Sequence, residues 1–575
     1  MADDKKPASK KITLPQADTG FPAERNLMLI FLLMGAMLLV TPYFYPNLTA
    51  PPAGKKGLEV KTSESPAKAA VPTPPSPAMA AAVATAAKPA KGAAAVTGVA
   101  ASKQENFSID TAQYRILFSN TGGTVVSWQL KKYKDSQGKP LELVNPRALV
   151  KLDAPFSLAI PTQQDLTYVN QRLFQHKTPP EGFGIDFEYA DAKVRVQKTF
   201  RVSEKDYRVQ VTSEVVAGGA TVPHNLTWRG GFGDLAAFNA SSFGHTVRYD
   251  TSLDRLLISE SKEALENQPK VDIGTFTFIG IDDPFFAAVF LPKQAKTLEH
   301  RTYVDTVQNY VGVEEKLIGT SVGGDGRNDL TLFVGPKDLD ELRKVSPQLE
   351  QLIDWGRYFG WLAKPMFQVM HWVHERVEKW SPGGSWGWAI VLITVAINFV
   401  MLPLKVTTLR SAKKMQALKP EMDRITKKYA GVGMSDPQSA KKNEELMELY
   451  KKHGVNPAGG CVPLLIQFPF LIALYTVLTV MIDLRQAKWL WVTDLSQPET
   501  LAIRLLPLMM IASQFILQKM TPTPGQDPAQ AKMMMFMPLM FGFMFYGQSS
   551  GLVLYWLVGN LVALGQQWAF NKFIK

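Results

Sequence analysis

The sequence contains a single cysteine, Cys461, among its 575 residues. One cysteine cannot form an intramolecular disulfide, and it excludes metal sites that need two or more cysteine ligands from one chain. Paired catalytic carboxylates, a serine–histidine pair and a phosphate-binding glycine loop are missing from the C-terminal third. The sequence therefore indicates no enzyme, no metal and no cofactor.

Residues 46–103 have few large apolar side chains and are rich in Ala, Pro and Lys. Such a segment cannot bury enough apolar surface to offset the entropy lost on folding. It predicts a disordered linker. Long hydrophobic runs stand out on both sides of it.

The hydrocarbon core of a bilayer is ~30 Å thick, so a helix needs ~20 apolar residues to cross it. Leu27–Tyr45 is followed by no small-residue cleavage site and predicts an uncleaved anchor. Met533–Trp568 is about twice the length of a span and is broken by Gly547–Gly551, which indicates two spans. Six spans are therefore expected, at 27–45, 386–404, 461–482, 501–517, 533–548 and 551–569.

Basic residues predict the orientation of these spans. The segment Lys405–Ala458 carries twelve Lys or Arg residues and six Asp or Glu residues. The segment Asp483–Ile503 carries only two Lys or Arg residues and three Asp or Glu residues. By the positive-inside rule the first segment is cytoplasmic and the second lies outside. Both termini, including the tail at 1–26, are then cytoplasmic, and residues 104–340 lie outside. The net charge of +12 favours a membrane surface over nucleic acid as the partner.

Residues 104–340 alternate polar and apolar side chains, as in Val194–Phe200 and Tyr207–Val211, between Gly-Gly turns. This pattern predicts an antiparallel β-sandwich. Residues 352–380 interleave aromatic and basic side chains and predict an amphipathic helix. Such a helix lies in the outer membrane interface or docks on the sandwich, and the adjacent span favours the interface.

The basic segment at 405–458 has a helical pattern of its own. Apolar residues recur at spacings of three and four, a heptad stripe, and a glycine-containing turn precedes a second helical stretch. We therefore expect a cytoplasmic helical hairpin. The stripe consists of Met415, Leu418, Met422, Ile425 and Tyr429.

Uncharged polar side chains lie inside four of the predicted spans. Thr394, Asn398 and Lys405 fall within about 40° of one another around a helix, with Lys405 at the cytoplasmic mouth. Polar groups at membrane depth face a wet cavity, or they form interhelical hydrogen bonds worth ~0.6 kcal/mol each. Their spread over four spans favours one shared hydrated groove. The other members are Gln467, Ser513, Gln514, Gln518, Asn560, Gln566 and Gln567.

Several short segments resemble the YidC/Oxa/Alb family of membrane protein insertases. The match is close over 386–570, and the layout of anchor, linker and outer domain is similar to the Gram-negative form. The segments are Val455–Pro457, Gly459–Pro469, Leu484–Ala487, Gln518–Met520 and Ser550–Trp556.

The resemblance implies a multidomain membrane protein. It would have a five-helix insertase core, an N-terminal anchor and an all-β periplasmic supersandwich domain. Its activity would be to insert and help fold nascent inner-membrane proteins, alone or with the Sec translocon, through a hydrophilic groove open to cytoplasm and lipid. Its implied partners are nascent membrane proteins, the ribosome, the translocon and lipid, with no sequence-specific nucleic acid.

The resemblance also assigns roles to residues of this chain. Trp556 joins the groove, and bases of the hairpin are expected to contact ribosome or substrate; these are Lys413, Lys414, Lys427 and Lys428. The family usually has a groove arginine where this chain has Asn398, which leaves open whether Lys405 replaces that charge. A polytopic solute transporter is the alternative, although no internal repeat supports it. An anchored carbohydrate-active enzyme rests on fold analogy alone.

Overall fold

In the computed structural model, the described residues are 98–573 apart from short gaps. The expected tail at 1–26, the anchor at 27–45 and the linker up to residue 97 lie outside them. The gaps are 136–137, 235–243, 262–263, 265–267, 295, 309–311, 357–358, 430–436, 456–461 and 522–527.

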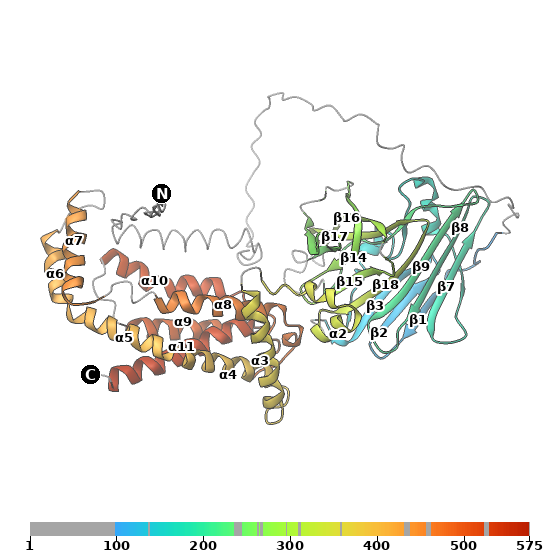
Figure 1. Ribbon diagram of the computed structural model, residues 1–575. Helices are drawn as coiled ribbons and strands as arrows, with labels where there is room; N and C mark the ends of the chain where they lie inside the picture. The colour runs from blue at the N-terminus through green and yellow to red at the C-terminus, as the bar shows by residue number, and fades with distance from the viewer. Residues whose placement is uncertain are drawn as a thin grey trace, which may run out of the picture. The chain divides into compact units, whose positions relative to one another are not determined.

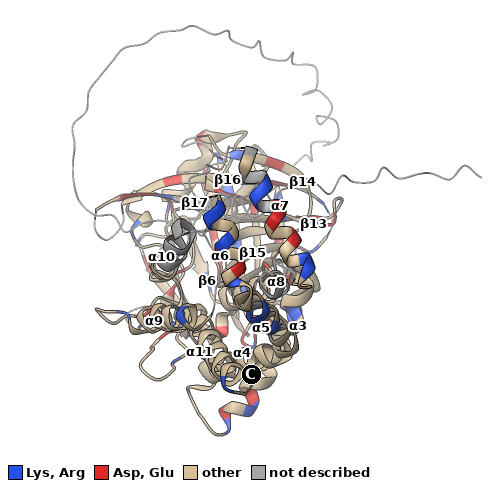
Figure 2. Ribbon diagram, turned by 90° about the vertical axis from the view of Figure 1, so that its left-hand side faces the viewer, with Lys and Arg blue, Asp and Glu red and all other residues tan. Residues whose placement is uncertain are grey.

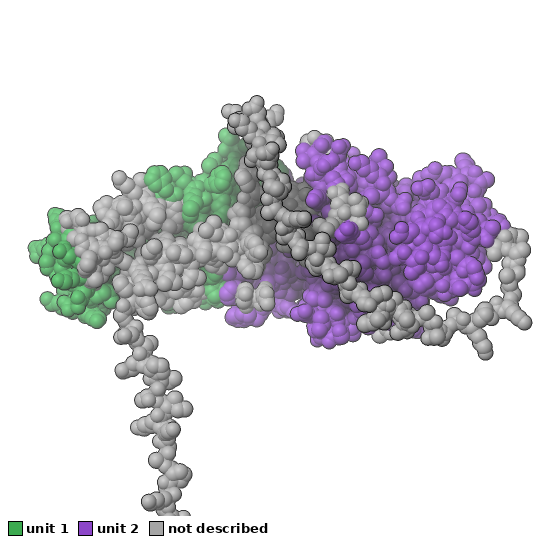
Figure 3. Space-filling view, turned by 90° about the horizontal axis from the view of Figure 1, so that it is seen from above, with its two compact units in different colours: residues 1–51, 388–470, 498–575 green, residues 52–387, 471–497 purple. Residues whose placement is uncertain are grey.

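The chain divides into two compact units (Figures 1 and 3). We call residues 52–387 with 471–497 the β-rich unit, and residues 1–51 with 388–470 and 498–575 the helical unit. A β-rich part followed by a helical C-terminal part was predicted from the sequence, and this coarse division is confirmed.

The β-rich unit contains two antiparallel sheets. The smaller has the order β1-β2-β3-β4, and the 14-stranded sheet has the order β5-β11-β17-β16-β14-β15-β18-β9-β8-β7-β6, with β10 beside β9 and β12 between β13 and β14. The strands are β1 (Asn106–Asp110), β2 (Tyr114–Ser119), β3 (Thr124–Lys134), β4 (Pro140–Glu142), β5 (Leu158–Ala159), β6 (Gln175–Lys177), β7 (Phe183–Ala190), β8 (Val194–Val202), β9 (Arg208–Ala217), β10 (Ala220–Thr221), β11 (His224–Trp228), β12 (His245–Asp250), β13 (Arg255–Ser259), β14 (Lys270–Asp282), β15 (Phe286–Pro292), β16 (Thr297–Gln308), β17 (Glu314–Asp325) and β18 (Arg327–Pro336).

Strand β8 shows why these segments pair. Every second residue from Val194 to Val202 is buried, because successive side chains of a strand point to opposite faces. Aromatic rings fill the space between the two sheets: Trp128 of β3 lies 6.2 Å from Trp228 of β11, measured between ring centroids. The alternation read from the sequence thus supplies the apolar core that joins the sheets.

A lysine is buried inside this core. The Lys198 amine donates to the carbonyl oxygens of Gly122 at 2.6 Å and Phe156 at 2.7 Å, and its side chain is 1% exposed. Gly122 and Phe156 both have positive φ values, 67° and 70°, which turn their carbonyls toward the amine. Lys198 therefore ties two connecting segments to β8.

Lys198 predicts a pH dependence of stability. Burial lowers the pKa of its amine from 10.5 to about 7. The unfolded chain therefore binds more protons between pH 7 and 10.5, and the stability of the β-rich unit rises with pH across that window. We expect the Tm of the purified protein to rise from pH 7 to 9, and Lys198→Met to remove the rise. Exposed Lys193→Met is the control, and an unchanged slope in Lys198→Met would contradict the assignment.

The segment that follows α8 (Val462–Val480) belongs to the β-rich unit. Arg485 forms an ion pair with Asp234, and the two side chains are only 5% and 10% exposed. The Arg485 guanidinium also lies 5.3 Å from the centre of the Phe286 ring. Next to it, Gln486 takes a φ of 59° and donates to the Lys134 carbonyl at 2.7 Å. Residues far apart in sequence are thus fixed together within one unit.

Removing Arg485 should destabilise this unit strongly. Arg485→Ala leaves the Asp234 carboxylate buried without its cation, a change that typically costs roughly 3–5 kcal/mol. The measurement is thermal unfolding of the purified protein. The exposed neighbour Lys488→Ala should leave the Tm within about a degree, because surface substitutions change stability by less than ~0.5 kcal/mol. Equal Tm values for the two variants would rule out a structural role for the pair.

Short helices follow the last strand. Asp338 caps α2 (Leu339–Val345) by accepting from the backbone N–H groups of its first turn, as N-cap aspartates do. A 3-10 helix, Pro347–Leu352, leads to α3 (Gly360–Glu378). Ala363, Met366, Met370 and Val377 of α3 are buried, whereas Trp361, Val369, Trp372 and the following Trp380 are exposed.

The remaining helices are either apolar or rich in charged residues. They are α4 (Ser385–Val400), α5 (Leu402–Ala417), α6 (Lys419–Lys428), α7 (Pro437–Lys452), α8, α9 (Leu505–Met520), α10 (Pro528–Phe545) and α11 (Ser550–Phe573). Within the described residues, no single helix has the length and hydropathy expected of a membrane span, and α4 with α5 meets that test only as a pair bent by 54°. The six-span count stays a prediction.

Helices α6 and α7 pack through the heptad stripe (Figure 2). Leu418, Met422, Leu449 and Val455 are buried together, with Met415, Ile425, Leu446 and Tyr450 packed around them. At the other end of α6, Lys428 and Tyr429 both hydrogen-bond Glu445 of α7, at 2.6 and 2.8 Å. The first arm breaks at Leu418, between α5 and α6, and Pro420 lies in the first turn of α6.

Candidate functional site

The bend between α4 and α5 positions the polar residues predicted on this face. Helix α4 ends at Val400 and α5 begins at Leu402 with Pro403 in its first turn. A proline there gives up an N–H that has no partner inside its own helix. The chain can therefore turn by 54° without losing a bond of α5.

Thr394 and Asn398 are buried on α4, with exposed fractions of 0% and 4%. The Thr394 hydroxyl donates to the Ile390 carbonyl at 2.6 Å, and the Asn398 amide donates to the Thr394 carbonyl at 2.8 Å. Both side chains thus satisfy a donor on their own helix. The Asn398 Oδ1 atom is left to accept from elsewhere.

The Lys405 ammonium donates a hydrogen bond to this oxygen of Asn398. Its Nζ lies 2.6 Å from Asn398 Oδ1 and 3.3 Å from Oε1 of Gln566 on α11. Gln566 also donates from Nε2 to the Asn398 backbone carbonyl at 3.2 Å. Within the described part of the chain, Lys405 forms no ion pair with a carboxylate. A cation with neutral acceptors keeps its charge available for an anion.

A second polar cluster joins α9 and α11. Asn560 is 7% exposed and donates to Ser513 Oγ at 3.1 Å, while Ser513 donates to the Met510 carbonyl at 2.8 Å. The bonds satisfy polar groups that would otherwise be costly to bury. They match the interhelical hydrogen bonding that was one of the two interpretations of these residues.

The other predicted groove residues lie around these clusters. Gln467 of α8 interacts with the hydroxyl of Tyr555 on α11. Trp556 is half-buried and packs on Phe541 and Phe545 of α10, with ring centroids 5.9 and 4.8 Å away. Trp556 is therefore an aromatic contact between α10 and α11.

Gln514 and Gln518 are both half-buried on α9. The Gln514 Oε1 atom is buried and accepts no hydrogen bond from the described residues. Neither glutamine is hydrogen-bonded to the Lys405 cluster within that part of the chain. The structure thus brings together some of the predicted groove residues but does not join all of them.

The hairpin bases Lys413, Lys414, Lys427 and Lys428 are all exposed. Figure 2 shows Lys and Arg positions in blue along α5, α6 and α7, with Asp and Glu positions in red among them on α6 and α7. Lys428 is used internally through its 2.6 Å ion pair with Glu445. Exposed bases of this hairpin are candidates for contact with a partner.

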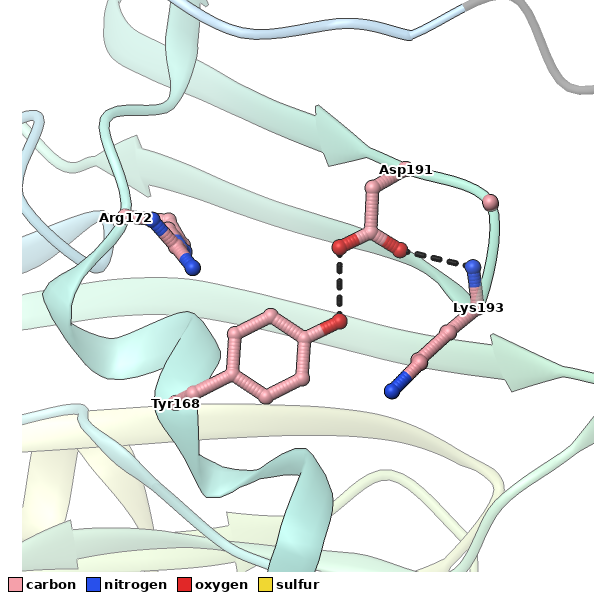
Figure 4. A pocket seen from close by; sticks show the side chains of 5 residues that line it. Tyr168, Arg172, Asp191 and Lys193 are labelled. Carbon is pink, nitrogen blue, oxygen red and sulfur yellow. Dashed lines mark hydrogen bonds between the residues drawn. The ribbon is translucent and has the colours of Figure 1, made fainter.

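A shallow pocket on the β-rich unit offers a second candidate site (Figure 4). Tyr168 donates to Asp191 Oδ2 at 2.6 Å, and the Lys193 backbone N–H donates to Oδ1 at 2.8 Å. Burial raises the pKa of Asp191, but hydrogen bonds, first that of Tyr168, hold it below the usual value. The Asp191 carboxylate therefore accepts hydrogen bonds that stabilise the turn between β7 and β8. Among the described residues, no cluster of His, Cys, Asp and Glu could hold a metal ion.

Known proteins match both parts of the chain. A family described as 60Kd inner membrane protein matches residues 377–575, and a family described as YidC periplasmic domain matches 106–369. The membrane protein insertase YidC of Ralstonia nicotianae is 32% identical over 560 residues, covering 94% of this chain and 93% of the relative. That of Janthinobacterium sp. (strain Marseille) is 31% identical and covers 82% and 85%. The chain belongs to the YidC family of membrane protein insertases.

A solved structure described as an active YidC insertase covers 83% of this chain and 94% of its own, with 18% identity and a TM-score of 0.35. A galactose mutarotase-like protein from Lactobacillus casei covers 40% of this chain, with 8% identity and a TM-score of 0.27. The family assignment rests on sequence.

Two features of this YidC-family chain were not foreseen from its sequence. Lys405 was expected at the mouth of a groove, roughly 10 Å along a straight helix from Asn398, yet the two side chains are in direct contact. Gln566 was recognised as a polar residue of the last span but not as a partner of Lys405. The 3.6-residue period placed Lys405 on the same face as Asn398, whereas its partner on α11 depends on tertiary packing.

Proposed function

We propose that this chain inserts hydrophobic segments of nascent membrane proteins into a bacterial inner membrane and helps them fold, alone or beside a Sec-type translocon. The observation that carries the proposal is the Lys405 cluster in a chain of the YidC family. An ammonium held by neutral amides between apolar helices suits transient contact with an anionic, partly desolvated segment. The relatives in Ralstonia and Janthinobacterium are named membrane protein insertases.

Insertion requires a polar loop of the substrate to cross lipid, where unsatisfied polar groups are costly. A groove lined by hydrogen-bonding side chains shortens the dry path. Burial of the substrate's apolar segment, worth ~25 cal/mol per Å², then drives the step without a nucleotide. The proposed lining is Thr394, Asn398, Lys405, Gln467, Ser513, Gln514, Gln518, Trp556 and Asn560.

The proposed topology has six spans, both termini in the cytoplasm and the domain at 104–340 in the periplasm. Helix α3 would lie in the outer interface. Its exposed Trp361 and Trp372 support this, as does the Arg376 guanidinium, 4.5 Å from the centre of the Trp372 ring, because tryptophan and basic residues are favoured at that depth. The linker at 46–103 would tether the domain to the anchor.

The proposal includes no catalytic residue and no cofactor. Its partners would be nascent membrane proteins, the ribosome, the translocon and lipid, with the hairpin at 405–458 receiving the substrate. The alternative of a solute transporter finds no support in the relatives from Janthinobacterium, Ralstonia and Bordetella avium, which are named membrane protein insertases. A solute-flux assay on liposomes that carry the purified chain would detect such an activity directly.

Lys405 should select for acidic substrates. Lys405→Gln keeps hydrogen bonding but removes the charge, so insertion of a substrate with an acidic translocated segment should fall roughly tenfold, about 1.4 kcal/mol. Lys405→Arg should retain most of the activity. The measurement is protease protection in proteoliposomes with two substrates that differ only in acidic or neutral residues. Equal losses for both substrates would refute charge recognition, and no insertion by the unmodified chain would refute the proposed function.

The hairpin should bind ribosomes through exposed bases. Charge reversal at Lys413, Lys414 and Lys427 should weaken co-sedimentation with ribosomes, most clearly at low salt, since ~0.1 M salt screens surface charges beyond ~10 Å. Reversal at the acidic residues Glu421, Asp423 and Glu444 is the matched control and should strengthen binding. Co-sedimentation that is the same for all variants would leave the bases as an ordinary solvated surface.

A further inference from the structure

The side chain of Gln566 touches both halves of the α4–α5 bend. A helix that ends leaves the carbonyls of its last turn without partners in the helix. At the end of α4, the Met401 N–H donates to the Ile397 carbonyl at 3.0 Å, and Gln566 Nε2 donates to the Asn398 carbonyl at 3.2 Å. Gln566 thus caps α4 from a different helix, α11.

The other amide atom of Gln566 faces the cation. Gln566 Oε1 accepts from Lys405 Nζ at 3.3 Å, beside the 2.6 Å bond to Asn398 Oδ1. An ammonium has three N–H donors, and these two amide oxygens are the acceptors it has among the described residues. The remaining donor and the full charge are left for a ligand.

We infer that Gln566 is a positioning residue for Lys405. One amide group fixes the bend through its N–H and orients the ammonium through its oxygen. The ligand presented to Lys405 is a carboxylate of the translocated substrate segment. This inference rests on the proposed insertase function and adds to it a residue on α11 that sets the strength of the charge selection.

The neutrality of residue 566 is essential to this role. A glutamate at this position would pair with Lys405 and compete with a substrate carboxylate, and it could not donate to the Asn398 carbonyl. Gln566→Glu therefore keeps the size of the side chain but removes the hydrogen bond to the Asn398 carbonyl and neutralises Lys405. Gln566→Leu removes both contacts and leaves the charge of Lys405 unpaired.

The neighbouring glutamine provides a matched control. Gln567 is 4% exposed, and its Nε2 donates to Asn571 Oδ1 of the same helix at 3.0 Å. Gln567→Leu and Gln567→Glu make the same chemical changes one residue away. They test the general effect of altering a buried glutamine on α11.

The experiment measures insertion of the acidic and the neutral substrate by full-length protein in proteoliposomes, expressed as their ratio. Gln566→Leu should lower the ratio roughly threefold, the value of a ~0.6 kcal/mol intramembrane hydrogen bond. Gln566→Glu should lower it as far as Lys405→Gln does. Although the sequence placed Gln567 among the groove residues, its side chain hydrogen-bonds Asn571. The Gln567 variants should therefore change insertion of both substrates alike and leave their ratio unchanged. Insertion of the neutral substrate reports folding in each variant.

Several results would overturn the inference. If Gln566→Leu and Gln566→Glu lower the insertion of both substrates by the same factor, Gln566 has only a structural role. If the ratio responds to Lys405→Gln but not to either Gln566 variant, Lys405 acts without this positioning. Failure of the unmodified chain to insert either substrate would instead reject the proposed function, so the two failures are distinguishable.

Discussion

The bond between the Lys405 ammonium and Asn398 crosses the bend between the apolar helix α4 and the basic helix α5. Burying a charge is costly unless its donors are satisfied, and pairing it with a carboxylate would satisfy it completely. Here the acceptors are the amide oxygens of Asn398 and Gln566. They hold the cation in place without neutralising it. The proposed selection of substrates depends on this arrangement.

A buried cation of the β-rich unit is satisfied in a different way. Arg485 is paired with the carboxylate of Asp234, and both side chains are nearly inaccessible. Lys198 has only backbone carbonyls as acceptors, but burial lowers the pKa of its amine to about 7, so it loses its charge above that pH. Lys405 differs from Arg485 because its acceptors among the described residues are neutral amide oxygens.

Local patterns predicted much of the fold. Alternation at Val194–Phe200 predicted a strand, observed as β8, and the heptad spacing from Met415 predicted the apolar contacts of α6 with α7. Each pattern reflects which side of one element is buried, so it can be read without knowing the partner. The break between α10 and α11, at residues 546–549, likewise falls where glycine and serine interrupt an apolar run.

Contacts between distant segments could not be predicted in this way. The pairing of Arg485 with Asp234 and of Lys405 with Gln566 requires knowing which elements are neighbours. The strand order, in which β12 lies between β13 and β14, could not be predicted for the same reason. In the candidate site, the sequence therefore identified Thr394, Asn398 and Lys405 as one face but not the side chain that orients the cation.

The most direct test of this account is a double-mutant cycle between Asn398 and Lys405, read as the rate of insertion of an acidic substrate. Asn398→Leu removes the acceptor, Lys405→Gln removes the charge, and the double variant removes both. If Asn398 acts by holding the ammonium, the double variant should insert the substrate no more slowly than Lys405→Gln alone. Losses that simply add would show that the two residues act independently, which would contradict the central role of their bond.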